Sequence, residues 1–170
     1  MNKREKEQIL YQTFSRACYE LELAGITIGT VDGIKINTRA KSRWGQCRTI
    51  NGRSTIEISD MLFEAKNPKA LITVVIHELL HTINPYAHHG GEWAEGAKKM
   101  NALYGYNIKR ASSPADYQVE YEAVKKHYKY RVYCPVCGAS WRYERRCQST
   151  ERAHAYRCGC GHKGLEVESL

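Results

Sequence analysis

The sequence of 170 residues lacks any long hydrophobic run. Its longest apolar stretch, Ala70 to Ile76, is interrupted by Thr73 and is far shorter than the roughly 18 residues that a membrane span needs. The first eight residues mix charges of both signs and lead into no apolar segment typical of a secretory signal. These absences predict a cytosolic protein that does not bind a membrane.

Internal repeats and low-complexity segments are also missing. The seven cysteines could form a disulfide framework, but an odd number without a secretory signal indicates thiols or metal ligands instead. Acidic residues are fewer than basic ones, 18 against 26, so the formal net charge is +8. The basic excess per residue is larger from residue 109 onward, where a polyanionic partner is expected to bind.

Local patterns predict an α+β fold. Apolar residues at helical spacing predict a first helix over residues 3–24, and Asn67-Pro68 predicts the start of an apolar helix that stops at Asn84-Pro85. A third helix is expected over residues 92–104. Short alternating segments within residues 26–58, with a hairpin signal at Asn51-Gly52, predict a small antiparallel sheet.

The C-terminal third has a different character. Ser113-Pro114 predicts the start of a basic, tyrosine-rich helix that reaches about Tyr130, and five of the seven cysteines follow it. We therefore predict a first domain over residues 1–110, a basic helical bridge over 111–131 and a metal-held module over 132–170.

The central helix contains the motif H-E-x-x-H, formed by His77, Glu78 and His81. Two histidines one helical turn apart point from the same face toward one ion, and Glu78 lies close enough to reach a water bound there. A third ligand is expected from His88 or His89, in the glycine-rich loop that follows the helix. The plainer alternative is a pair of helical histidines without an ion.

Two motifs carry a resemblance to a known family. The run from Val74 to His81, followed by His89-Gly90-Gly91-Glu92-Trp93, resembles the SprT-like zinc metallopeptidase family, whose motif continues as H-G-x-E-[FW]. The segment Arg39 to Cys47 and the cysteine-rich tail are similar to the hairpin and the C-terminal zinc ribbon of that family. The resemblance implies a minimal zincin-like domain, with helices packed on a small antiparallel sheet, and a β-rich zinc ribbon.

Carried over to this chain, the resemblance implies that His77, His81 and His89 bind the catalytic zinc ion and that Glu78 is the general base. It prefers His89 to His88, because His89 precedes the Gly-x-Glu-Trp sequence. Glu92 is equally a ligand-orienting residue or a charge that favours the helix dipole, and Trp93 is expected to be a packing anchor.

Other residues near the motif leave alternatives open. Arg43, Trp44 and Cys47 form either a structural hairpin, which we favour, or an edge of the cleft along which a substrate strand pairs. Three tyrosines are candidates for stabilising an oxyanion, and the sequence does not choose among Tyr86, Tyr104 and Tyr106.

The cysteine tail predicts a second, structural zinc site. Cys134 and Cys137 have the C-x-x-C spacing of a metal knuckle, whereas Cys158 and Cys160 have one residue fewer between them than the family pattern. We favour these four cysteines as ligands, with Cys147 or His162 as substitutes for the fourth. The alternative is a set of reduced thiols without metal.

Aromatic residues alternate with arginines between the two cysteine pairs, an arrangement that suits base stacking and phosphate binding. The candidate nucleic-acid contacts are Trp141, Arg142, Arg145, Arg146 and Arg157. A solvated ribbon face with packing aromatics is an equal alternative. The related Spartan proteins cleave proteins crosslinked to DNA, so the resemblance also implies nucleic acid as a partner.

The sequence thus predicts a zinc-dependent endopeptidase with one catalytic and one structural Zn²⁺, a protein substrate and DNA or another nucleic acid as partner. The alternative hypothesis is a nucleic-acid-binding adaptor, in which the H-E-x-x-H site is idle and the zinc ribbon performs the function.

Overall fold

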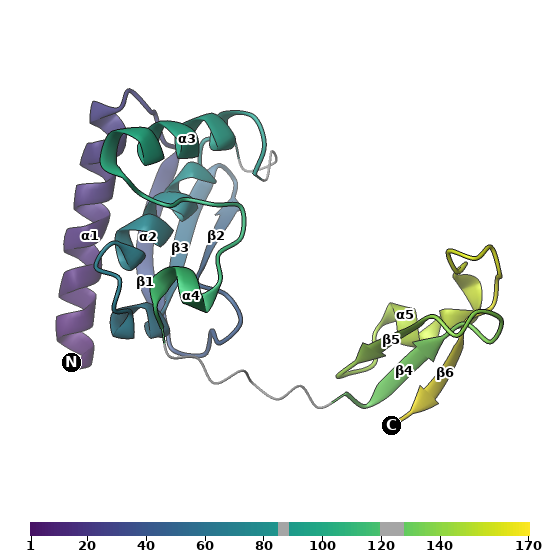
Figure 1. The fold of residues 1–170 in the computed structure, drawn as a ribbon. Coiled ribbons are helices and arrows are strands. Elements are labelled where there is room, and N and C mark those ends of the chain that lie inside the picture. The colour runs from purple at the N-terminus through teal and green to yellow at the C-terminus, as the bar shows by residue number, and fades with distance from the viewer. Residues whose placement is uncertain (85–88, 120–127) are drawn as a thin grey trace. The chain divides into compact units, whose positions relative to one another are not determined.

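The computed structural model describes residues 1–84, 89–119 and 128–170, and the chain divides into two compact units, residues 1–122 and 123–170. Figure 1 shows the helices and strands of each unit as a ribbon, and each unit has a hydrophobic core of its own. The predicted α+β fold is confirmed. The first unit extends beyond the predicted boundary at residue 110, because Tyr117 and Val119 belong to its core. None of the helices in the described ranges is both long and apolar enough to cross a membrane.

Helix α1 (Lys3–Leu23) follows the predicted boundaries closely. It begins with a capping box, in which the Asn2 side chain accepts from the Glu5 N–H at 3.0 Å and the Glu5 carboxylate accepts from the Asn2 N–H at 2.8 Å. The apolar side chains at helical spacing, Leu10, Ala17 and Leu21, are buried against the rest of the unit.

Helix α2 (Ala70–Leu80) is the centre of the first unit and contacts α1, the sheet and α3 (Glu92–Tyr104). It begins later than predicted, because the Asn67 side chain accepts from the Lys69 N–H at 2.9 Å in a turn before the helix. Most of its side chains are buried, as a helix covered on several sides requires. The α3 boundaries match the prediction, and Gly105 ends α3 with a left-handed φ of 64°.

Two glycines let neighbouring segments approach α2 very closely. A Cβ placed on Gly29 would lie 2.5 Å from the Thr82 carbonyl oxygen, and one placed on Gly96 would lie 2.6 Å from Leu80 Cδ2. Carbon atoms in van der Waals contact are normally about 3.5–4.0 Å apart, so neither position has room for a methyl group. Close packing therefore fixes the end of α2 and the turn after it against the segments that carry Gly96 and Gly29.

The sheet of the first unit has the order β1-β3-β2, formed by β1 (Thr30–Asn37), β2 (Gly45–Ile50) and β3 (Arg53–Ser59). The predicted β2–β3 hairpin is antiparallel, and its turn uses positive φ at Asn51 (51°) and Gly52 (74°). By contrast, β1 pairs in parallel with β3, which lies between β1 and β2 in the sheet. This order leaves β2 at an edge of the sheet.

After a short 3₁₀ helix, η1 (Asp60–Glu64), and helices α2 and α3, the first unit ends with α4 (Pro114–Tyr117). The capping signal at Ser113 is correct, but Gln118 has a left-handed φ of 53° and ends the helix. Tyr130, the predicted end of this helix, begins a strand. Residues 120–127 of the predicted bridge lie outside the described residues.

The second unit is β-rich, as predicted. Strand β4 (Tyr130–Tyr133) pairs antiparallel with β5 (Ser140–Tyr143) on one side and β6 (Glu166–Ser169) on the other. A short helix, α5 (Gln148–Glu151), and a 3₁₀ turn, η2 (Ala153–Ala155), connect β5 to the last strand. Its small core consists of Val132, Cys134, Ala153, Cys158 and Leu165.

Candidate metal centre

Three histidine side chains from two segments converge beside α2. His77 and His81 lie one turn apart on the helix, and His89 comes from the turn that precedes α3. The Nε2 atom of His77 lies 3.3 Å from Nε2 of His81 and 3.1 Å from Nε2 of His89. His88, the alternative third ligand, lies outside the described residues. The structure therefore brings together the three predicted histidines.

The donor set and its spacing fit a zinc ion. Imidazole nitrogens bind zinc at about 2.0–2.1 Å, so nitrogens in a tetrahedral site lie about 3.3 Å apart. Burial, together with the charges of His81 and His89, lowers the pKa of His77 to about 3, although hydrogen bonding to the backbone of Lys109 acts in the opposite direction. His77 is therefore neutral at physiological pH, which is the form that binds metals.

Trp93 holds this histidine group in place. Its side chain is buried, and its Nε1 donates to the His77 carbonyl oxygen at 3.2 Å. Its ring centroid lies between 4.6 and 5.8 Å from those of all three histidines. Trp93 thus has the packing role expected from the sequence. Glu92, by contrast, is exposed in the first turn of α3, where its charge favours the helix dipole.

Glu78 lies beside the histidines and is only 6% exposed. The pKa of its carboxyl is raised to about 7, because the effect of burial exceeds the lowering effects of hydrogen bonding with the backbone of Cys47 and of the positive charge of Arg43. A carboxyl group that titrates near neutral pH can both accept and return a proton. This environment suits the predicted general base.

The histidines and Glu78 line a cleft of about 460 Å³. One wall is the edge strand β2 with its hairpin turn, and it includes Cys47. Arg110 also lines the cleft, and the sequence did not predict it, because nothing distinguishes the pair Lys109-Arg110 from ordinary surface cations. The volume lies in the range typical of ligand-binding clefts.

The hairpin residues singled out from the sequence divide between two roles. Trp44 is structural: its Nε1 donates to the Ser112 carbonyl oxygen at 3.1 Å, and its ring meets that of Tyr117 edge-on at 5.3 Å. Arg43 lies 3.5 Å from the Glu57 carboxylate. Cys47 lines the cleft, so the strand edge predicted beside the cleft is present there.

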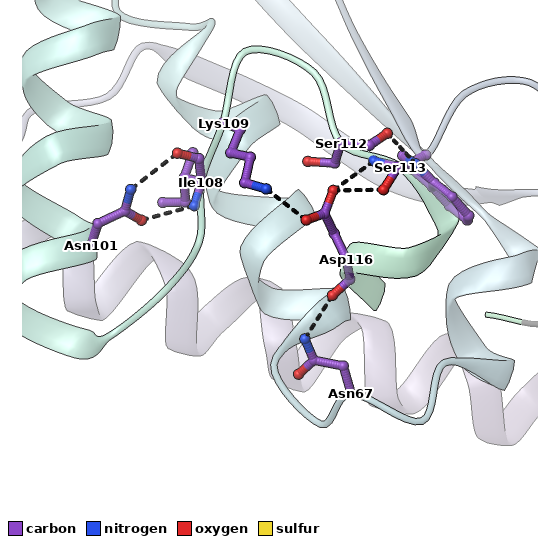
Figure 2. Close-up of polar contacts among 8 residues, drawn as sticks. Asn67, Asn101, Ile108, Lys109, Ser112, Ser113 and Asp116 are labelled. Atoms are coloured by element: carbon purple, nitrogen blue, oxygen red, sulfur yellow. Dashed lines mark hydrogen bonds and ion pairs between the residues drawn. The ribbon is translucent and has the colours of Figure 1, made fainter. Parts of the chain in front are cut away.

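A network of polar contacts fixes the segment of residues 106–113, which carries Arg110 (Figure 2). The Asn101 side chain donates to the Ile108 carbonyl oxygen at 3.0 Å and accepts from the Ile108 N–H at 2.8 Å. Asp116 binds Lys109 at 2.6 Å and accepts from the Ser113 N–H at 2.8 Å (Figure 2). Side chains of α3 and α4 thus hold the segment that carries Arg110.

The tyrosine candidates for an oxyanion site do not line the cleft where the structure describes them. Tyr104 donates to the Glu20 carbonyl oxygen at 3.3 Å, and Tyr106 donates to the Glu20 carboxylate at 2.5 Å. Both hydroxyl groups are therefore engaged with α1. Tyr86 lies outside the described residues.

Comparison with protein-family models matches residues 10–112 to the SprT-like family. The chain belongs to the SprT-like family. The matched region contains the three histidines, Glu78 and β2, so we call residues 1–122 the SprT-like unit. Family membership gives this unit a metallopeptidase-like fold. No curated protein matches the chain.

The second unit, which we call the ribbon, brings together the four favoured cysteines. The sulfur atoms of Cys134, Cys137, Cys158 and Cys160 all lie within 4.8 Å of one another. The shorter Cys158–Cys160 spacing is accommodated by a turn in which the Cys158 N–H donates to the His162 carbonyl oxygen at 2.8 Å. Within the described ranges, Cys147 and His162 are not part of this group.

Four thiols at this separation fit a structural zinc ion. Backbone hydrogen bonding, mainly from Cys137, lowers the pKa of Cys134 to about 6. Several neighbouring thiolates without a cation would repel one another, whereas a divalent metal ion compensates their charge. The four-cysteine site of the ribbon and the three-histidine site of the SprT-like unit are therefore both suited to zinc.

Two of the predicted nucleic-acid contacts, Trp141 and Arg142, lie on opposite faces of the ribbon sheet, because they are neighbours on β5. Trp141 pairs with the buried Val132 and is 44% exposed at the margin of the core face. On the Arg142 face, Arg131 forms an ion pair with Glu168 at 2.8 Å.

Proposed function

We propose that this protein is a zinc-dependent endopeptidase of the SprT-like type. The observation that carries the proposal is the convergence of three histidine side chains with a buried carboxylate beside an open cleft. His77, His81 and His89 would hold the zinc ion. A purely structural site has no use for Glu78, whose side chain is buried next to these ligands at a cost in desolvation.

A zinc ion with three protein ligands and an open position polarises a peptide carbonyl and makes water nucleophilic near neutral pH. Glu78 then accepts a proton from the attacking water at a carboxylate oxygen and returns it to the nitrogen of the departing amine. The edge strand β2 orients an extended substrate chain through its unpaired backbone groups. Arg110, which also lines the cleft, would lie near the bound substrate.

The substitution Glu78→Gln tests the enzymatic proposal. It removes the proton acceptor and preserves the side-chain shape, so cleavage of labelled casein is expected to fall by at least about 100-fold. Zinc content per chain should not change. Glu92→Gln is the matched control, because Glu92 is exposed and lies outside the cleft wall, and it should cleave at the parent rate.

Equal rates for Glu78→Gln and the parent would show that Glu78 is not the general base. A parent chain that cleaves no protein, with or without DNA, would favour the adaptor function instead.

We further propose that the substrates are proteins associated with nucleic acid, such as proteins crosslinked to DNA, and that the ribbon binds the nucleic acid. The support is the basic excess of the C-terminal region, together with the exposed aromatic Trp141 and the arginines that follow β5. Bases would stack on Trp141 while Arg145 and Arg146 meet phosphates. Glu166 and Glu168 make the Arg142 face less favourable for a polyanion.

Binding of the full chain to fluorescent single-stranded DNA tests this second proposal. Trp141→Ala is expected to weaken binding by about 5- to 100-fold, the usual effect of losing one stacking platform. Arg142→Ala, on the opposite face, is the comparison variant and should have a smaller effect. Binding that does not weaken as salt is raised would contradict phosphate recognition.

A further inference from the structure

Strand β2 comes unusually close to Glu78 at Gly45. A Cβ placed on Gly45 would lie 2.5 Å from Glu78 Oε1, 2.7 Å from its Cγ and 2.9 Å from its Cδ. These separations are well below the about 3.5–4.0 Å of normal contacts between carbon atoms. No side chain larger than hydrogen fits between the strand and the Glu78 side chain.

The backbone conformation of Gly45 does not by itself require glycine. Its φ lies outside the left-handed region, in which several other glycines of the chain are found. Gly33, in strand β1 of the same sheet, also has an ordinary φ, and a Cβ placed there would meet no atom within 4 Å. The requirement at Gly45 is therefore one of space, and the atoms that need the space belong to Glu78.

The surroundings of Glu78 explain why its side chain lies there. It is buried between α2 and the edge strand, and hydrogen bonding with the Cys47 backbone lowers its pKa against the effect of burial. Gly45 pairs with Ile58 and Cys47 with Ile56, so β3 holds this part of β2 from the other side. The carboxylate thus lies against a strand that is itself fixed.

We propose that Gly45 is a positioning residue, whose missing side chain lets the Glu78 carboxylate lie against the β2 backbone beside the three histidines. In Gly45→Ala the methyl group would occupy the place of the carboxylate, and Glu78 would have to rotate away from its position. The kinetic consequence rests on the proposed peptidase function. The contact itself is a property of the fold and can be tested without activity.

The kinetic test compares three single variants of the zinc-loaded full chain on labelled casein. Displacing a reacting group by about 1 Å costs about 100-fold in rate, so Gly45→Ala should lower kcat by that order, with KM and zinc content little changed. Gly33→Ala, the control in open space, should stay within about twofold of the parent. Gly96→Ala crowds Leu80 instead of Glu78, so it shows how far the rate falls when the fold is disturbed but the Glu78 carboxylate is not displaced.

The activity-independent test is a double-mutant cycle on the melting temperature. Gly45→Ala should lower Tm by several degrees in the parent background. In the Glu78→Ala background, which lacks the crowded atoms, Gly45→Ala should lower Tm by no more than Gly33→Ala does. Gly96→Ala should lower Tm equally in both backgrounds, because it does not touch Glu78.

Equal losses of Tm for Gly45→Ala with and without Glu78 would overturn the contact. Coupled Tm values with an unchanged kcat would overturn the positioning role in the reaction. If the parent itself cleaves nothing, the proposed function fails, and the Tm cycle still decides whether Gly45 makes room for Glu78.

Discussion

The SprT-like unit and the ribbon are stabilised in different ways. The SprT-like unit buries a core formed by α1, α2, α3 and the sheet, and its candidate metal ligands lie at the margin of that core. The core of the ribbon has five residues, and two of them, Cys134 and Cys158, are also metal-ligand candidates. A segment this small rarely folds on hydrophobic burial alone. In the ribbon, therefore, part of the core is made of candidate metal ligands, whereas the core of the SprT-like unit does not include its three histidines.

Loss of each metal site should therefore have opposite consequences, and this is the largest effect we expect. Cys137→Ser should unfold the ribbon, because structural zinc sites contribute about 10–16 kcal/mol of binding free energy that is coupled to folding. His77→Ala should remove zinc from the SprT-like unit and leave it folded. Hydrogen exchange, read separately for peptides of each unit, measures both outcomes. Ribbon peptides that stay protected from hydrogen exchange in Cys137→Ser would contradict a metal-dependent fold of the ribbon.

The metal-free SprT-like unit should show a pH dependence that comes from Glu78. Burial raises the pKa of Glu78 from 4.5 to about 7, so the folded state binds more protons than the unfolded state between these values. Relative to Glu78→Gln, the parent is most stable below pH 4.5 and loses about 2 to 3 kcal/mol as pH rises through 7.

Urea unfolding at pH 5 and pH 8, followed by the helical circular dichroism signal, measures this difference for the two metal-free chains. The shift of His77 is common to both chains, so it does not affect the comparison between them. A constant difference between the chains at the two pH values would contradict the raised pKa of Glu78.

The smallest expected effect concerns the capping box of α1. Asn2→Ala removes the acceptor for the Glu5 N–H, and such losses cost about 1 kcal/mol. The loss should appear only in hydrogen exchange of the SprT-like unit. Gln8→Ala, exposed on the same helix, should change stability by no more than a few tenths of a kcal/mol. A matching loss in ribbon peptides would show that the two units unfold together.

Local signals in the sequence predict the observed elements well. The Asn51-Gly52 turn and the stop at Gly105 act within a few residues of where they occur, so they predict a hairpin and a helix end directly. The two histidines of H-E-x-x-H are likewise one turn apart in sequence and in space.

What could not be predicted depends on segments distant in sequence. The parallel β1–β3 pair requires β3 to enter between two earlier strands, and no pattern within β1 specifies this. Helix α4 ends at Gln118 although the following residues suit a helix. Arg110 lines the cleft on a segment that the distant side chains of Asn101 and Asp116 hold by polar contacts. The Gly45–Glu78 contact joins residues of a strand and a helix.

The three glycines packed against α2 have a consequence for how this chain tolerates mutation. Gly29, Gly45 and Gly96 crowd Thr82, Glu78 and Leu80 respectively, so alternate residues from the last turn of α2 into the turn after it each meet a neighbour that cannot gain a methyl group. Glycine codons become alanine codons by a single base change. In a library of all single substitutions, these three positions should therefore be depleted of alanine, whereas Gly33, with the same codon family and open space, should accept it.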